Sequence, residues 1–155
     1  MPTAPPAHPR AFFVYGTLLR GEPNHRVIAR LGLAGVRAAR VRGRLFDTGE
    51  GYPAMLAPLE PRAGQGGDAP AQGAGVVAGE LMVPADLAAA LRDLDALEEF
   101  FGPGDPHNLY ERREVEADTG EGAPVRAWAY LYVGTARLVP IPSGDWKAHQ
   151  QGVGP

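Results

Sequence analysis

One carboxylate in the sequence lies where a leucine would be expected. Between residues 84 and 100, leucines recur at helical spacing and share one face at about 100° per residue: Leu87, Leu91 and Leu94. The next position on that face is Glu98, whereas Glu99 is rotated towards solvent. Apolar surroundings, the nearby charges of Asp95 and Glu99, and the negative end of the helix should each raise the pKa of Glu98. A carboxyl with a raised pKa is suited to move protons near neutral pH.

The helical phase leaves a structural interpretation of Glu98 equally open. At the end of the helix its side chain could bend out to water or pair with Arg112 or Arg113. Other catalytic groups are scarce, because the sequence has no cysteine and its four histidines are far apart. We therefore expect no disulfide, no cysteine nucleophile and no metal site. If the protein is an enzyme, a buried carboxylate is the simplest catalytic group that it offers.

A second candidate feature is the segment 12–18. Its aromatic and β-branched residues predict a buried strand, which ends in a short turn: Tyr15, Gly16, Thr17 and Leu18. A glycine turn after a strand can present backbone N–H groups to a small acidic ligand. Spacing alone favours the simpler interpretation, a core strand followed by a turn. The sequence contains neither of the glycine motifs typical of nucleotide binding.

Composition indicates one globular domain. The chain has 155 residues, of which 45% are hydrophobic, with a net charge of −3 and a pI of about 5.8. This balance argues against a nucleic-acid surface. Residues 1–10 lack the apolar segment of a signal peptide, and no apolar run reaches membrane length, so we expect a cytoplasmic protein without a membrane partner.

The many glycines and prolines, 21 and 16, favour short strands joined by loops. Strands are expected at 11–15, 36–46, 52–56, 76–83, 110–117 and 125–133, with a short helix after Asn24 and a main helix over 84–100. A sheet that curls into a barrel explains why 76–83 is apolar on both faces around Gly79. The predicted fold class is α+β, a small mixed and mostly antiparallel curled sheet or barrel with one main helix. It forms a single domain over 11–146, with flexible tails at 1–10 and 147–155 and a flexible loop at 62–75.

The arginines of strand 36–46 alternate with apolar residues and give the strand a basic face: Arg40, Arg42 and Arg44. A solvated strand face is the simpler interpretation, and binding to an acidic protein partner is the alternative.

Several short motifs resemble the gamma-glutamylcyclotransferase-like superfamily, and most closely its gamma-glutamylamine cyclotransferase branch. The most specific is the run from Val14 through Tyr-Gly-Thr-Leu-Leu-Arg-Gly-Glu-Pro-Asn to His25. Shorter ones follow in the same order as in the family: Gly51-Tyr52-Pro53-Ala54, Gly79-Glu80-Leu81, Leu94-Asp95-Ala96-Leu97-Glu98, Tyr110-Glu111-Arg112 and Ala127-Trp128-Ala129-Tyr130. The resemblance covers nearly the whole domain, from Phe12 to about Trp146.

The resemblance implies a small barrel with a cavity and an intramolecular cyclotransferase. Such an enzyme releases 5-oxoproline and a free amine or amino acid from a γ-glutamyl amide, without a cofactor. The resemblance also assigns the acid/base role to Glu98. It implies that the substrate is bound by five residues: Tyr15, Gly16, Thr17, Leu18 and Tyr110. The expected partner is a small γ-glutamyl molecule, and the protein is expected to be a monomer or homodimer. A non-catalytic binding module with the same cavity is the alternative.

Two features of this chain bear on its choice of substrate. Glu99 stands where many members of the superfamily have glycine, so a second acid adjoins the catalytic one. The loop 101–108 is expected to border the cavity. The leaving amine is not identified by the resemblance.

Overall fold

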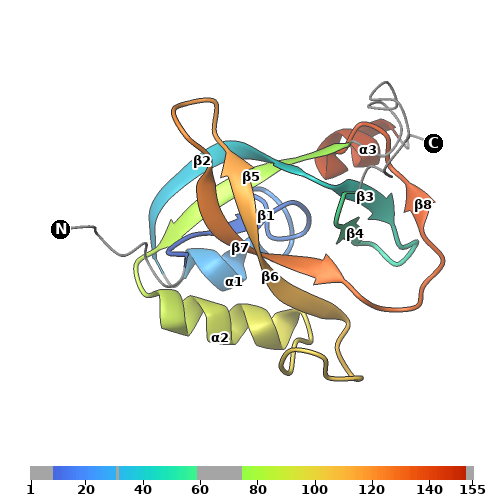
Figure 1. Ribbon diagram of the computed structural model, residues 1–155, viewed down its shortest axis with the longest axis horizontal. Coiled ribbons are helices and arrows are strands. Elements are labelled where there is room, and N and C mark those ends of the chain that lie inside the picture. Colours follow the sequence, from blue (N-terminus) through green and yellow to red (C-terminus); the bar gives the residue numbers. More distant parts are fainter. Residues whose placement is uncertain (1–8, 31, 59–74, 153–155) are drawn as a thin grey trace, which may run out of the picture.

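Five strands close into a barrel in the computed structural model, which describes residues 9–30, 32–58 and 75–152. Their order around the barrel is β1 (Phe12–Val14), β5 (Val76–Pro84), β2 (Leu33–Arg42), β6 (Tyr110–Asp118) and β7 (Val125–Tyr132) (Figure 1). All pairs are antiparallel except β1 with β7. The predicted α+β class with a small, mostly antiparallel barrel is therefore confirmed.

The barrel closes through its shortest strand. β1 lies between β5 and β7, with Phe12 opposite Met82 on one side and opposite Trp128 on the other. The approach of β1 to β5 is very close at Gly79, where a Cβ atom would lie 2.1 Å from the Val14 carbonyl oxygen. Only glycine fits this position, which explains the interruption of an otherwise apolar strand.

A smaller sheet stands beside the barrel. It contains β3 (Arg44–Asp47), β4 (Pro53–Leu56) and β8 (Val139–Pro140) in the order β4-β3-β8 (Figure 1). The prediction of one strand over 36–46 is wrong, because the chain leaves the barrel at Gly43 and enters this second sheet. A Cβ atom at Gly43 would lie 2.8 Å from the end of the Met55 side chain and 3.0 Å from the Leu56 carbonyl oxygen, so the crossing leaves little room for a side chain. Pro53 begins β4, as expected for a residue without a backbone N–H.

Three helices complete the fold: α1 (His25–Ala29), α2 (Leu87–Leu97) and α3 (Trp146–Gly152). α2 begins later than predicted, because Pro84 ends β5 and the carboxylate of Asp86 caps the helix by accepting from the Ala89 N–H at 3.1 Å. Of the helices in the described ranges, none is long and apolar enough to cross a membrane.

Helix α3 corrects the predicted flexible tail over its residues 147–152. Trp146 is only 2% exposed and belongs to the barrel core. His149 Nε2 lies 2.8 Å from Asp47 Oδ2, and the Lys147 ammonium donates to the Arg20 carbonyl. These contacts fasten α3 to β3 and to the segment after β1. The predicted tail at 1–8 and nearly all of the predicted loop at 62–75 fall outside the described residues.

Alternate residues of the barrel strands face two separate cores. On β7, Ala127, Ala129 and Leu131 belong to the core inside the barrel, whereas Tyr130 and Tyr132 belong to the core under α1 and α2. Two of these three inner residues of β7 are alanines, which suits the narrow interior of a barrel of five strands. In the outer core, Ala90 and Leu94 of α2 pack with Ile28 of α1. This packing fixes the end of α2 next to the end of β1.

Candidate active site

Helix α2 ends in a motif that gives its last two glutamates different directions. The Phe100 N–H donates to the Asp95 carbonyl at 2.9 Å, and the Glu99 N–H donates to the Ala96 carbonyl at 3.3 Å. These are the two hydrogen bonds of a Schellman motif, with Glu98 as the C-cap residue and Glu99 in the left-handed position. Glu98 has a φ of −89°, whereas Glu99 has a φ of +55°. The chain therefore reverses its course between the two carboxylates.

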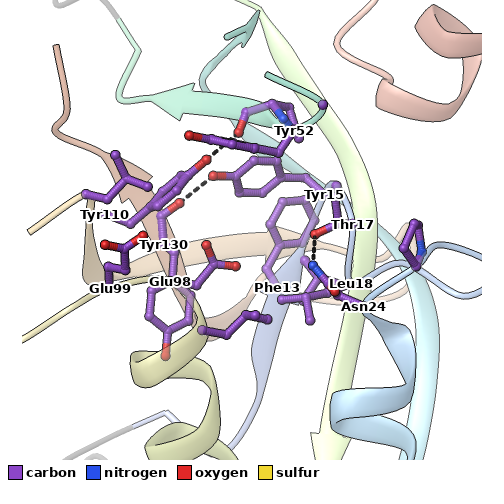
Figure 2. A pocket seen from close by; sticks show the side chains of 17 residues that line it. Phe13, Tyr15, Thr17, Leu18, Asn24, Tyr52, Glu98, Glu99, Tyr110 and Tyr130 are labelled. Atoms are coloured by element: carbon purple, nitrogen blue, oxygen red, sulfur yellow. Dashed lines mark hydrogen bonds between the residues drawn. The ribbon is translucent and has the colours of Figure 1, made fainter. Parts of the chain in front are cut away.

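A cavity of about 360 Å³ opens where the end of α2 meets the end of β1. Its lining includes every residue that the sequence singled out: Tyr15, Gly16, Thr17, Leu18, Glu98 and Tyr110. Figure 2 shows Glu98 pointing towards the middle of this group, between Tyr15 on one side and Tyr110 and Tyr130 on the other. The structure thus brings together six residues that are up to 95 positions apart in the sequence (from 15 to 110).

Glu98 is partly buried, and its carboxyl has neither a hydrogen bond nor an ion pair with any residue that the structure describes. Arg112 lies 3.7 Å from Asp95, and Arg113 lies 2.8 Å from Glu111. The ion pairs with Glu98 that the sequence left open are therefore not formed. Burial, and after it the charge of Glu99, raises the pKa of Glu98 to about 7. Such a carboxyl exchanges a proton readily at neutral pH.

Side chains of α1 and the residue before it hold the turn after β1 in place. Asn24 donates from its backbone N–H to the Thr17 carbonyl at 2.8 Å and from its amide to the Thr17 hydroxyl at 3.0 Å. His25 Nδ1 lies 3.0 Å from the Leu18 carbonyl oxygen. Among the described residues, no turn hydrogen bond uses the N–H groups of Gly16, Thr17 or Leu18. Three backbone donors beside the cavity are thus available to a ligand.

Gly16 is required by the packing of this turn. A Cβ atom there would lie 2.6 Å from Cγ of Pro53, the first residue of β4. The Pro53 carbonyl in turn accepts from the hydroxyl of Tyr110 at 2.6 Å. The turn, the start of β4 and the start of β6 therefore pack as one wall of the cavity.

Buried tyrosines form the rest of the wall. The Tyr15 hydroxyl donates to the Tyr130 carbonyl at 2.5 Å, and the Tyr130 hydroxyl donates to Asp95 at 2.6 Å. Burial raises the pKa of Tyr15 and of Tyr110 well above the usual value, and the charge of Glu98 adds to the effect in both. These phenols therefore remain neutral hydrogen-bond donors over the whole physiological range.

Sequence reasoning assigned no role in the site to several other residues of this cavity, and four of them carry polar contacts or rings in its wall: Asn24, Tyr52, Pro53 and Tyr130. All four occur in the motifs that resemble the superfamily, so the signal was present although no role was assigned. The expectation for the loop 101–108 is wrong, because none of its residues lines the cavity. Asn108 folds this loop onto itself by accepting from the Phe101 N–H and donating to the Gly102 carbonyl.

The site contains one carboxyl that can exchange a proton, three backbone donors and neutral phenols. Within the described residues there is no group of three side chains that could hold a metal ion. This set is suited to acid/base chemistry on a small molecule that carries negative charge.

Comparisons with known proteins agree with this description. Residues 12–148 match the family model described as gamma-glutamyl cyclotransferase, AIG2-like. The gamma-L-glutamyl-butirosin B gamma-glutamyl cyclotransferase of Niallia circulans is 36% identical over 138 residues, which are 89% of this chain and 76% of that protein. The human gamma-glutamylaminecyclotransferase is 58% identical, but only over 45 residues, or 29% of this chain and 27% of that one.

A similar fold occurs in solved structures. An AIG2-like protein of Mus musculus has a TM-score of 0.51 at 27% identity, with 83% of this chain and 80% of the mouse chain covered. YkqA of Bacillus subtilis has a TM-score of 0.57 at 26% identity. The match covers 92% of this chain but only 41% of YkqA, so the chain spans less than half of that protein.

Proposed function

Because the chain belongs to the gamma-glutamyl cyclotransferase, AIG2-like family, whose named relatives are enzymes, we propose that it cyclises a γ-glutamyl amide to 5-oxoproline and a free amine or amino acid. The observation that supports this most strongly is the place of Glu98. Its carboxyl lies in the cavity without a partner among the described residues, with a pKa of about 7, in the same lining as the turn after β1.

The reaction needs one proton carrier. The ionised carboxyl of Glu98 takes a proton from the α-ammonium group of the substrate, and the freed amine attacks the γ-carbonyl carbon of the same molecule. A carbon–nitrogen bond forms and closes a five-membered ring. When the original amide bond breaks, the leaving nitrogen takes the proton from Glu98, and the carboxylate is restored. The ring nitrogen loses its second proton, which the departing amine takes up to leave as an ammonium ion. The pKa of Glu98 suits both halves of this transfer.

The turn after β1 supplies neutral donors for negative charge. Among the residues that the structure describes, no lysine, arginine or histidine lines the cavity. The α-carboxylate of the glutamyl group, or the oxyanion that develops on the γ-carbonyl, must therefore be bound by uncharged N–H and O–H groups. The N–H groups of Gly16, Thr17 and Leu18 are suited to this, because charge-assisted hydrogen bonds in a dry site are strong. Holding the substrate folded contributes further, since the attack is intramolecular.

The test is release of 5-oxoproline from a panel of γ-glutamyl compounds by the purified full chain, followed by mass spectrometry. The panel contains γ-glutamyl amines and γ-glutamyl amino acids, and the control is the Glu98→Gln protein at equal concentration. Release by the unchanged protein alone supports the proposal. A protein that binds these compounds but releases no 5-oxoproline would instead be the binding module that the sequence left as an alternative.

A further inference from the structure

The cavity carries more negative charge than the proposed reaction needs. Of the side chains in the described ranges, two carboxylates line it, those of Glu98 and Glu99, and no cationic side chain does. Glu98 is accounted for as the proton carrier. Glu99 is exposed, and its carboxylate has no hydrogen bond or ion pair with the described part of the chain. The nearby cation Arg112 is engaged by Asp95 and by the rings of Phe100 and Trp128.

Glu99 also occupies a backbone conformation that disfavours it. Its φ of +55° belongs to the left-handed region, where Cβ lies too close to the following carbonyl oxygen in a residue with a side chain. Glycine is the usual residue at this position of a Schellman motif. The backbone bond from the Leu109 N–H to the Glu99 carbonyl, at 3.0 Å, does not depend on the side chain. The contacts of the fold therefore do not explain why a glutamate stands here.

The left-handed conformation directs the side chain to one part of the cavity rim. Figure 2 shows Glu99 on the outer side of Glu98, next to Tyr110. The hydroxyl of Tyr52 in the same lining donates to Glu50 at 3.0 Å. Burial raises the pKa of Tyr52 to about 12, and the charges of Glu50 and Glu99 both add to this effect. The negative charges of two carboxylates thus act on the same tyrosine, and the rim beside it is acidic.

The reaction geometry places the leaving group at this rim. The glutamyl α-ammonium must reach Glu98, and either the α-carboxylate or the oxyanion that develops on the γ-carbonyl must reach the donors of the turn after β1. The α-carbon and the γ-carbonyl of the folded glutamyl group are then both held deep in the cavity, and the amine on the far side of the scissile bond extends outwards past Glu99. We propose that Glu99 is a specificity residue, which selects γ-glutamyl amides whose leaving amine carries a second, positively charged group. This inference rests on the proposed function and adds the chemical class of the substrate.

Two matched substrates test the proposal. γ-Glutamyl-cadaverine and γ-glutamyl-pentylamine share the glutamyl group and the five-carbon chain, and differ in the terminal ammonium group. The unchanged protein should use the cationic amide with a kcat/KM higher by roughly tenfold, as for a hydrogen-bonded contact with a charged group. In Glu99→Gln the preference should fall close to one, and in Glu99→Lys it should reverse.

The ratio of the two substrates isolates the contact. Removing the charge of Glu99 also changes the pKa of Glu98, but this affects both substrates equally and cancels in the ratio. Glu121→Gln is the matched control, because Glu121 pairs with Arg37 on the exposed end of the barrel and its loss should leave the ratio unchanged. Equal use of both amides by the unchanged protein, or a preference that survives in Glu99→Gln, would overturn the proposal.

A second readout separates this inference from the reaction itself. Affinities for the two amides can be measured by calorimetry in the Glu98→Gln protein, which should bind them without turnover. A preference for the cationic amide that disappears in the Glu98→Gln, Glu99→Gln double variant supports the role of Glu99. If the Glu98→Gln protein shows no preference for the cationic amide, Glu99 is not a specificity residue, even where the unchanged protein forms 5-oxoproline. If no γ-glutamyl compound is turned over, the proposed function is wrong. The affinities then test only whether Glu99 binds the terminal ammonium group.

Discussion

Glu98 and Glu99 are adjacent in the chain, yet one carboxyl is partly buried inside the cavity and the other is exposed at its rim. The end of α2 separates them, since Glu98 retains a φ of −89° and Glu99 has a φ of +55°. Their charges still interact, because Glu99 contributes to the raised pKa of Glu98. One residue is thus placed for proton transfer, and its neighbour affects it from the solvent side.

Replacing the proton carrier should abolish most of the activity. Glu98→Gln keeps the size and hydrogen-bonding capacity of the side chain but cannot exchange a proton. We expect turnover to fall by roughly 10²–10⁴-fold, the range typical of general acid–base catalysis. Substrate affinity, measured by calorimetry, should be retained. Nearly full turnover in this variant would exclude Glu98 as the acid/base.

The activity should depend on pH through Glu98. With its pKa at about 7, kcat/KM should rise as the pH increases towards neutrality, because the ionised carboxyl is the base. In Glu99→Gln the like charge is removed, so the pKa of Glu98 should fall and the acidic limb should move to lower pH. The measurement is the kcat/KM profile of both proteins with one neutral substrate. If the acidic limb of the profile lay at the same pH in both proteins, ionisation of Glu98 would not control it.

The carboxyl of Glu98 should also make the free energy of unfolding depend on pH. In the unfolded chain the pKa of Glu98 has its ordinary value of 4.5, and in the folded protein it is about 7. Between these values the folded state holds a proton that the unfolded state has lost, so stability decreases as the pH rises through this window. The difference of about 2.5 units sets an upper limit of about 3 kcal/mol to this loss.

Glu98→Gln should not show that loss. Its free energy of unfolding in urea should exceed that of the unchanged protein at pH 8, and the difference should shrink at pH 5. If both proteins lost stability in parallel between these two pH values, ionisation of Glu98 would not be the cause.

The packing of the turn against β4 gives a prediction about Gly16. In Gly16→Ala the new methyl group would overlap the ring of Pro53, so the turn or the start of β4 must shift. Overpacking of this kind costs typically about 1–3 kcal/mol. Substrate affinity should fall as well, because Pro53 also holds Tyr110. Gly35→Ala is the control, since a Cβ atom there meets nothing within 4 Å and both stability and affinity should be nearly unchanged.

The sequence indicated which residues would line the cavity better than it predicted the bounds of the elements around them. The helical phase directed Glu98 towards the core, and the buried strand with its glycine turn gave the second half of the cavity. Both signals are local, because they follow from periodicity and from one backbone position. The contact between Gly16 and Pro53 could not be predicted in this way, since it joins segments that meet only after the barrel closes.

The break between β2 and β3 and the helix α3 were not predicted for the same physical reason. The break at Gly43 lies inside a run that alternates regularly, and only the crowding by Met55 reveals why the chain must change sheets there. Helix α3 has a single large apolar residue, Trp146, so it shows no periodicity, and it is held by contacts with distant residues such as Asp47. Patterns within one segment carry no information about such contacts.

The position of β1 between β5 and β7 has a consequence for how the protein is made. During synthesis the first strand emerges early, but one of its two neighbours is completed only at Tyr132, more than a hundred residues later. Contacts so distant in sequence form slowly, since a long loop must be closed first. The turn after β1 should therefore acquire its final place late in folding, and a nascent chain that ends before β7 should have no active cavity, however much of its other structure has formed.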